Sequence, residues 1–239
     1  MSAKKLLVIG AHSADFVWRS AGSIAVTVAN GGSASVVALS YGERGESGDL
    51  WRDNPEQTVE NVKRIRHEMA EEAADHVGAS FRCLDLGDYP LHISNDNLAE
   101  LVQIILAESP DVILTHAARD PFNPDHPIAH TAVQRARLLA AGAGVASAFQ
   151  RITPPAWYAF EPHQPELCGF QPNTFIDITP VMDKKIKALN VMKVQSYLID
   201  YYTELAARRG NHAMRVSGDR AIKYAEAHER QLPWVVSEL

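Results

Sequence analysis

The chain has 239 residues, 46% of them hydrophobic, a formal net charge of −6 at pH 7 and two cysteines. This length can bury a full core, and we expect one domain over residues 1–239. The acidic balance argues against a nucleic-acid partner. Two cysteines outside any Cys-x-x-Cys pair allow one disulfide but do not indicate a disulfide framework. An acidic substrate remains compatible, because a pocket can be locally basic.

Runs of apolar and β-branched residues predict strands at residues 6–11, 35–41, 81–86, 111–115, 157–160 and 175–178. Helical patterns predict helices at residues 21–29, 58–76, 97–109, 128–139, 181–202 and 221–229. We expect Thr58 to cap the second helix and the Val-Gly pair at 77–78 to end it. The alternation predicts an α/β fold with a mostly parallel sheet and helices on both faces.

The sequence does not suggest a membrane partner. The first residues lead into a strand without the long apolar stretch of a signal peptide, and no apolar run is long enough to span a bilayer. We therefore expect a cytoplasmic protein. The apolar segment at residues 233–236 (PWVV) resembles an interface patch, so we also expect a homo-oligomer.

Polar residues follow four predicted strands at the carboxyl ends, where open parallel sheets bind ligands. They are His12, the loop at 43–46, Asp88 and residues 116–126. We expect all of them to converge on one rim of the sheet. A dinucleotide is not expected there, because no glycine-rich phosphate-binding pattern occurs.

The strongest chemical pattern is His12 and Asp15, three residues apart after the first strand. Imidazole and carboxylate are ligands that suit zinc, and His126, in the segment NPDH, is the third ligand that we expect. Manganese or iron would accept the same donors. Asp125 is expected to orient an imidazole. His130, one helical turn further on, has the same role or is an ordinary helix residue.

These two motifs resemble the PIG-L/LmbE family of zinc-dependent N-acetylglucosaminyl deacetylases, which usually read AHPDD and HPDH. Further similar segments lie at residues 42–43, 66–68 and 224–227, so the resemblance covers most of the chain. It implies a Rossmann-like three-layer α/β sandwich and a zinc site. It is much less specific for the reaction.

Two departures from the family pattern affect the chemistry. The first Asp of AHPDD, the general base of the deacetylases, is Ala14 here, and the first His of HPDH is Asn123. A methyl group cannot accept a proton, and general-base catalysis is typically worth ~10²–10⁴-fold. The metal ligands are therefore kept, whereas the groups for amide hydrolysis are not.

Residues 11–19 (AHSADFVWR) resemble a branch of the family, the bacterial 4-oxalomesaconate hydratases of gallate and protocatechuate catabolism. The resemblance implies a hydro-lyase that adds water to a C=C bond of a planar tricarboxylate (4-oxalomesaconate, or 4-carboxy-2-hydroxymuconate) and gives 4-carboxy-4-hydroxy-2-oxoadipate. Two alternatives stay open at this point: a zinc-dependent N-deacetylase of an amino-sugar conjugate, and a metal-binding scaffold without catalysis.

Water addition needs groups that move protons. Glu46, in a glycine-rich loop, and His163, in a proline-framed loop after a strand, are the expected acid and base. Glu43 and Glu161 are alternatives, with Glu43 more typical of the loop framework in the family. His116 and Asp120 are expected to border the pocket, or His116 is instead a strand-end residue bonded to the backbone.

A polycarboxylate substrate also needs cations and hydrogen-bond donors, and arginine suits carboxylates best. The expected substrate-binding residues are Arg66, Arg44, Arg19 and Asn123. Arg66 ranks first because it matches an arginine that the family uses for substrate contact.

Overall fold

The computed structural model describes residues 3–236 and 238, and its strands join in one twisted sheet. The sheet has seven strands in the order β3-β2-β1-β4-β5-β7-β6. The strands are β1 (Lys5–Gly10), β2 (Ser33–Ala38), β3 (Ser80–Cys83), β4 (Val112–Thr115), β5 (Ala156–Phe160), β6 (Thr174–Asp177) and β7 (Ala225–Arg230). β1 to β5 pair in parallel, whereas β7 runs antiparallel to β5 and β6.

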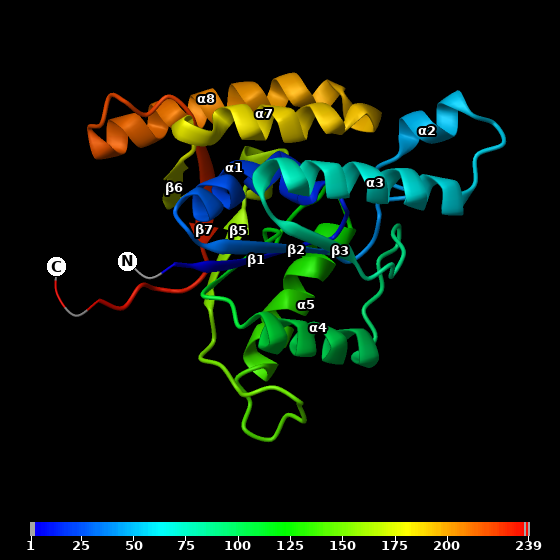
Figure 1. Ribbon diagram of the computed structural model, residues 1–239, viewed down its shortest axis with the longest axis horizontal. Coiled ribbons are helices and arrows are strands. Elements are labelled where there is room, and N and C mark those ends of the chain that lie inside the picture. Colours follow the sequence, from blue (N-terminus) through cyan, green and yellow to red (C-terminus); the bar gives the residue numbers. More distant parts are fainter. Residues whose placement is uncertain (1–2, 237, 239) are drawn as a thin grey trace.

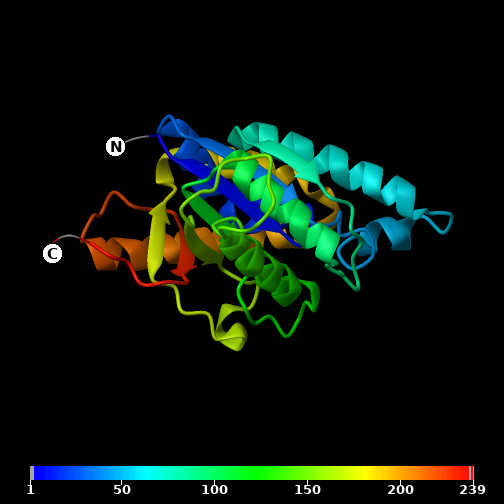
Figure 2. The same ribbon diagram turned by 90° about the horizontal axis from the view of Figure 1, so that it is seen from below.

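Helices cover both faces of this sheet, as Figures 1 and 2 show. One face carries α1 (Asp15–Ala29), α3 (Val59–Val77), α7 (Met182–Val191) and α8 (Tyr197–Ser217). The other carries α4 (Asn95–Glu108) and α5 (Asp125–Leu139). The short α2 (Gly48–Asp53) and α6 (Pro165–Cys168) lie in loops. The predicted α/β fold with a mostly parallel sheet between helical layers is therefore confirmed. A single domain over 1–239 stays a prediction.

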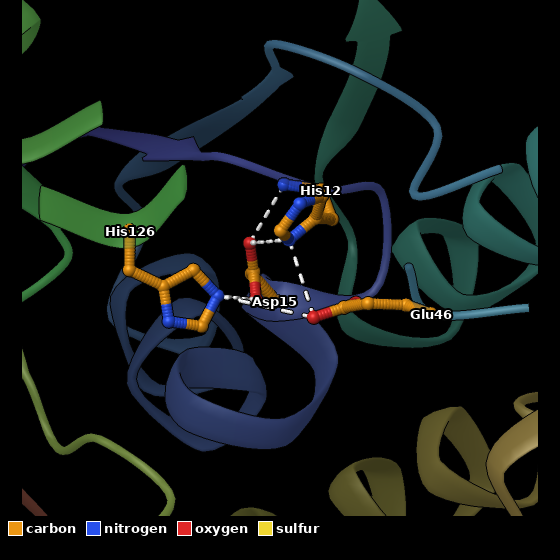
Figure 3. A group of neighbouring side chains, drawn as sticks. All are labelled: His12, Asp15, Glu46 and His126. Carbon is orange, nitrogen blue, oxygen red and sulfur yellow. Dashed lines mark hydrogen bonds and ion pairs between the residues drawn. The ribbon is translucent and has the colours of Figure 1, made fainter. Parts of the chain in front are cut away.

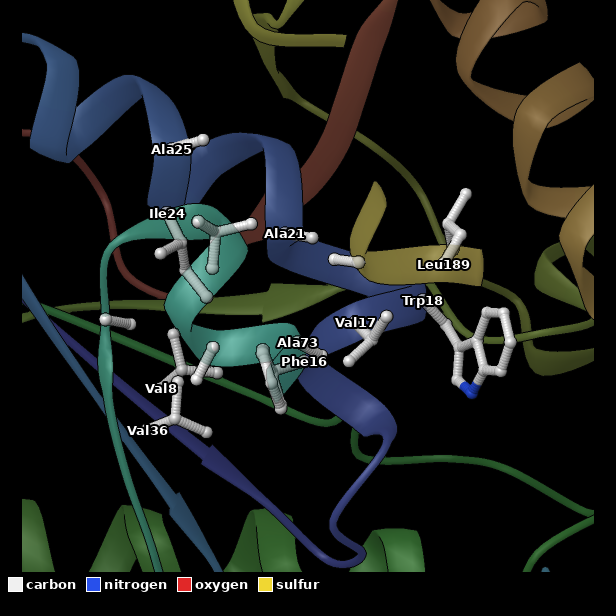
Figure 4. Packing of buried hydrophobic residues seen from close by; sticks show 14 of the residues in the cluster. Val8, Phe16, Val17, Trp18, Ala21, Ile24, Ala25, Val36, Ala73 and Leu189 are labelled. Atoms are coloured by element: carbon white, nitrogen blue, oxygen red, sulfur yellow. The ribbon is translucent and has the colours of Figure 1, made fainter. Parts of the chain in front are cut away.

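Each helical layer seals its own apolar core. On the α1 face, Val8 and Val36 of the sheet pack under Phe16 and Ile24 of α1, as Figure 4 shows, and all four are at most 2% exposed. On the opposite face, α4 and α5 bury a second cluster against the sheet. Each fully buried side chain of this size contributes about 1.5–3 kcal/mol, so both layers hold the strands in place.

The chain reverses its direction of travel across the sheet between β1 and β4. From β1 it proceeds outward through β2 to β3, and it then returns to the other side of β1 to form β4 and β5. A crevice opens at such a reversal, beyond the carboxyl ends of the strands. The loops that follow β1 and β4 therefore face each other across the expected binding edge.

Helix α3 begins and ends where the sequence predicts. Thr58 accepts a hydrogen bond from the backbone N–H of Asn61 (3.2 Å), and Gly78 ends the helix with a left-handed φ of 78°. Such a cap contributes about 1 kcal/mol. These signals are local in the chain, which is why the sequence alone locates them.

The predicted single helix over 181–202 is wrong, because α7 and α8 are separated by the 3-10 turn Lys193–Gln195. The apolar periodicity continues through this turn and conceals the break. Gln195 lies in this turn, and its Oε1 accepts a hydrogen bond from Arg66 Nη1 (3.1 Å).

The predicted helix over 221–229 is also wrong, because most of this segment forms the strand β7. Its pairing with β5 and β6 and the burial of two polar residues override helix propensity. The Glu226 carboxylate accepts hydrogen bonds from the backbone N–H groups of Gly22 and Ser23 and pairs with Lys185 Nζ (2.5 Å). Within the described residues, no helix combines the length and apolar character needed to cross a membrane.

Candidate active site

Four side chains from three segments of the chain meet at the carboxyl edge of the sheet. They are His12, Asp15, Glu46 and His126, called the metal cluster below, and Figure 3 shows them turned toward one another. His12 Nδ1 lies 3.2 Å from Glu46 Oε1 and 3.6 Å from Asp15 Oδ2. His126 Nε2 lies 3.6 Å from Asp15 Oδ1 and 3.8 Å from Glu46 Oε1. The three predicted metal ligands therefore come together, with Glu46 beside them.

Local structure fixes each member of the cluster. His12 follows β1 directly, and Asp15 is the first residue of α1, which begins six residues before the predicted start. The Asp15 carboxylate accepts a hydrogen bond from the backbone N–H of His12 (2.7 Å). Gly42 has a φ of +70°, and a Cβ there would lie 3.2 Å from the Cβ of His12 and 3.3 Å from that of Glu46. Glycine is therefore needed for the loop to pass this close.

Carboxylates behind the cluster hold both imidazoles. His12 Nε2 lies 3.2 Å from Asp125 Oδ2, and His126 Nδ1 lies 2.8 Å from Asp120 Oδ2. These contacts place the N–H of each ring on its outer nitrogen. The inner nitrogens, His12 Nδ1 and His126 Nε2, are buried and have no hydrogen-bond partner among the described residues. Two unpartnered lone pairs facing two carboxylates form a donor set that fits a divalent metal.

The electrostatics of the cluster also favour a cation. Burial alone would lower the pKa of His12, but the charge of Glu46 and the hydrogen bond to Asp125 raise it well above its usual range. Without a metal, the carboxylates thus attract a proton to this ring. A divalent ion supplies the same positive charge and leaves the imidazole free to coordinate.

Two further histidines support the cluster from behind. The ring of His116 stacks on that of His126, with centroids 3.9 Å apart, and His116 Nε2 accepts a hydrogen bond from the backbone N–H of Ala11 (2.9 Å). Burial lowers the pKa of His116 to about 3, so this ring is neutral. His130 donates from Nδ1 to the backbone oxygen of His116 (2.8 Å) and holds the loop rather than an imidazole of the cluster.

A cavity of about 310 Å³ opens beside the metal cluster. Five of the predicted site residues line it: Arg19, Glu46, Asn123, His126 and His163. The other lining residues are Trp18, Gly45, Gly48, Asp49, Tyr89, Phe122, Val194, Gln195, Tyr197, Leu198 and Tyr202. A ligand in this cavity therefore touches both the cluster and the residues expected to move protons.

Glu46 is the member of the cluster most open to this cavity. Its side chain is 12% exposed, whereas the side chains of His12 and Asp15 are fully buried. Burial alone would raise the pKa of Glu46, but the charge of His12 lowers it well below its usual range. Asn123 donates from Nδ2 to Glu46 Oε1 (3.3 Å), and Arg66 Nη2 lies 3.8 Å from Oε2. An ionised carboxylate in this position can accept a proton.

His163 lies in the loop after β5, with its ring against that of Tyr201 (centroids 4.5 Å apart). Burial and the charge of Arg19 lower its pKa, so the ring is neutral near pH 7. The two alternative proton carriers lie outside the lining of the cavity. Glu161 is paired with Arg209, and the buried Glu43 lies 3.2 Å from Arg44 Nη1.

The three predicted arginines occupy different positions. Arg19 lines the cavity and pairs through Nη1 with Asp15 Oδ1 (2.5 Å). Arg66 is buried behind Glu46 and donates from Nε to the backbone oxygen of Tyr41 (3.1 Å). The Arg44 side chain is 51% exposed and turns toward Glu43 and Asp88. Of the three, Arg19 alone lines the cavity.

Some residues of the site escape sequence reasoning. Asp120 was expected only as a possible border residue of the pocket, but its contact with His126 orients that ring. The sequence does contain a signal for this contact, because Asp120 lies only six positions before the candidate ligand His126. Trp18 and Tyr202 also line the cavity, and their helical spacing marks them only as core residues. Ala14 is fully buried in the apolar cluster of the α1 face and brings no proton acceptor.

The fold and the cluster define an α/β protein with a His/carboxylate cluster that could hold a metal ion, at the edge of the sheet where the chain reverses between β1 and β4. The family described as "PIG-L: GlcNAc-PI de-N-acetylase" matches residues 7–137. The chain belongs to this PIG-L family.

Two relatives from Pseudomonas putida KT2440 match nearly the whole chain. A protein named 4-oxalmesaconate hydratase is 44% identical over 239 residues, which cover 99% of this chain and 92% of the relative. The crystal structure of GalB, the 4-carboxy-2-hydroxymuconate hydratase, superposes with a TM-score of 0.96 at 44% identity and 99% coverage of both chains. N,N'-diacetylchitobiose deacetylase from Pyrococcus horikoshii, at 20% identity, TM-score 0.74 and coverage of 95% of this chain and 84% of its own, shares the fold.

Proposed function

We propose that this protein is a zinc-dependent hydro-lyase that adds water to 4-oxalomesaconate (4-carboxy-2-hydroxymuconate) and forms 4-carboxy-4-hydroxy-2-oxoadipate in the catabolism of gallate and protocatechuate. The observation that carries the proposal is a complete metal cluster combined with Ala14 and Asn123 in place of the groups for deacetylation. The identity and coverage of the two hydratase relatives support it. An N-deacetylase is not favoured, because nothing at position 14 can activate water for attack on an amide.

Different residues of the site would bind the metal and transfer the protons. His12, Asp15 and His126 would hold the metal, which as a Lewis acid polarises the oxygen groups of a conjugated keto acid. Addition of water joins a hydroxyl to one carbon of the double bond and a proton to the other. Glu46, which is ionised, is the base that takes the proton from water. His163, which is neutral, takes up a proton from solvent and delivers it to the other carbon. Glu46 then releases its proton to solvent, so one water is added in all.

The cavity suits a small polycarboxylate rather than a macromolecule. Arg19 and Asn123 contact the substrate directly, while Arg66 acts through Glu46, whose carboxylate it faces at 3.8 Å. A direct substrate contact of Arg44 requires the exposed guanidinium to turn away from Glu43 and Asp88. A cytoplasmic location and a homo-oligomeric state belong to the same proposal.

The decisive experiment follows the near-ultraviolet absorbance of 4-carboxy-2-hydroxymuconate. Zinc-loaded protein should bleach it, metal-depleted protein should not, and added zinc should restore the rate. The product should have gained one water by mass spectrometry. An undiminished rate after thorough metal removal overturns the proposal. Release of acetate from an N-acetylated amino sugar without any hydration identifies the deacetylase instead.

A further inference from the structure

Three buried hydrogen-bond donors on residues that line the cavity have no acceptor among the described residues. Arg19 Nε, Trp18 Nε1 and Tyr202 Oη are buried and lack a hydrogen-bond partner in the described part of the chain. All three residues line the cavity, and each is at most 7% exposed. A buried polar group without a partner typically costs about 1–3 kcal/mol, so three neighbouring ones indicate a missing acceptor.

The three side chains form one continuous wall. The rings of Trp18 and Tyr202 stack with centroids 5.6 Å apart, and Trp18 and Arg19 are consecutive residues of α1. The Tyr202 ring also lies 5.9 Å from that of His163. In Figure 4 the indole nitrogen of Trp18 is turned away from Leu189 of the core. Arg19 meanwhile contacts Asp15 through Nη1, which joins this wall to the metal cluster.

The chemistry of the donors defines their partner. Arginine and tryptophan can only donate, and burial raises the pKa of the Tyr202 hydroxyl, so it keeps its proton. A carboxylate is an acceptor with up to four lone-pair sites. Arg19 is also the only lysine or arginine among the lining residues, all of which the structure describes. A polycarboxylate therefore has one fixed guanidinium in the cavity to bind.

We propose that Arg19, Tyr202 and Trp18 form a carboxylate-binding subsite beside the metal cluster, in which the Tyr202 hydroxyl donates to the substrate carboxylate that Arg19 binds. This inference rests on the proposed function and assigns the recognition of one carboxyl group of its substrate. Tyr202 is a binding residue here, because its hydroxyl touches the substrate but moves no proton.

The variant Tyr202→Phe removes only the hydroxyl and keeps the ring that stacks on Trp18. We expect KM for 4-carboxy-2-hydroxymuconate to rise about 10- to 100-fold, the size of one hydrogen bond to a charged group. The value of kcat should stay within about twofold and its pH profile should keep its shape, because the contact exists in the ground state and in the transition state alike. Tyr158→Phe, on β5 outside the cavity lining, is the matched control and should behave as wild type.

A binding measurement separates this subsite from the reaction. Tricarballylate, a saturated tricarboxylate that cannot be hydrated, and acetate, which is small enough to need the metal alone, are titrated calorimetrically into zinc-loaded proteins. Tyr202→Phe should weaken tricarballylate about 10-fold or more and leave acetate unchanged. Trp18→Phe, which removes the indole N–H, should act in the same direction.

The outcomes are distinct. An unchanged KM and unchanged tricarballylate affinity in Tyr202→Phe overturn the subsite, even if hydration proceeds. Equal losses for both ligands, or a fall in zinc content or in the unfolding midpoint, show a structural role and overturn it as well. If wild type hydrates nothing but Tyr202→Phe selectively loses tricarballylate, the subsite stands and the proposed reaction fails.

Discussion

Within the metal cluster, burial distinguishes side chains of similar chemistry. Asp15 and Glu46 are both carboxylates within 4 Å of an imidazole of the cluster. Asp15 is fully buried and is engaged by the backbone N–H of His12 and by Arg19. Glu46 is partly exposed to the cavity. The first arrangement suits a fixed ligand, and the second suits a group that exchanges protons with a substrate.

This difference predicts the effect of Glu46→Gln, which keeps the shape of the side chain but accepts no proton. The value of kcat should fall about 10²–10⁴-fold, the usual contribution of a general base. Zinc content measured by atomic absorption should stay near one per chain, whereas His12→Ala should lose the metal. If Glu46→Gln loses zinc to the same degree as His12→Ala, Glu46 is a ligand and not the proton carrier.

Sequence reasoning reached the residues of the site that lie in short motifs. His12, Asp15 and His126 follow strands or begin helices, so spacing alone indicated that they meet. Asp120, Trp18 and Tyr202 belong to the site through contacts in space. Tyr202 comes from α8, far along the chain, and its spacing is that of any core residue. Only the packing of α8 against α1 reveals it.

Among the elements, α1 connects the site to the far part of the sheet. Its first turns carry Asp15 and Arg19, and its middle carries Ser23, whose hydroxyl contacts both Glu226 (2.7 Å) and His228 Nε2 (2.8 Å) of β7. The predicted helix over 221–229 missed this connection. In the sequence, Glu226 and His228 look like residues of a solvent-exposed helix face, whereas in the structure both are buried on strand β7. By contrast, the caps of α3 are local and were predicted correctly.

The contact between α1 and β7 predicts how stability depends on pH. Burial lowers the pKa of His228 to about 4, against 6.5 for a free histidine. The unfolded chain therefore binds this proton between pH 6.5 and 4 while the folded chain does not. Stability is fully present above pH 6.5 and falls as the pH drops toward 4, by at most on the order of 3 kcal/mol for this group.

Urea unfolding of wild type and His228→Gln at a series of pH values checks this. The variant should be less stable near pH 7, and its free energy of unfolding should change less between pH 6.5 and 4. His92→Gln, at an exposed position, serves as the control. Identical pH dependence in wild type and His228→Gln would show that the buried imidazole titrates normally.

At the scale of the molecule, the described surface carries an exposed apolar segment after β7. Trp234 is 77% exposed and Val235 is 89% exposed, and the guanidinium of Arg230 lies 5.6 Å from the Trp234 ring centre. In Figure 1 this segment, in red, extends from the end of β7 toward the C-terminus. Exposed apolar side chains in succession are unfavourable in water, and a second copy of the chain is the partner that the sequence predicted.

The homo-oligomer therefore stays a prediction with a direct test in the double variant Trp234→Ser, Val235→Ser. Removing both apolar groups should shift the molar mass measured by light scattering toward the monomer at equal concentration, because burial of this surface contributes about 25 cal/mol per Å². Val216→Ser, at a position that is 78% exposed near the end of α8, controls for a general change in solubility. Since the metal cluster and the cavity are built from one chain, zinc content should not change in either variant. A mass unaffected by the double variant assigns any assembly to another surface.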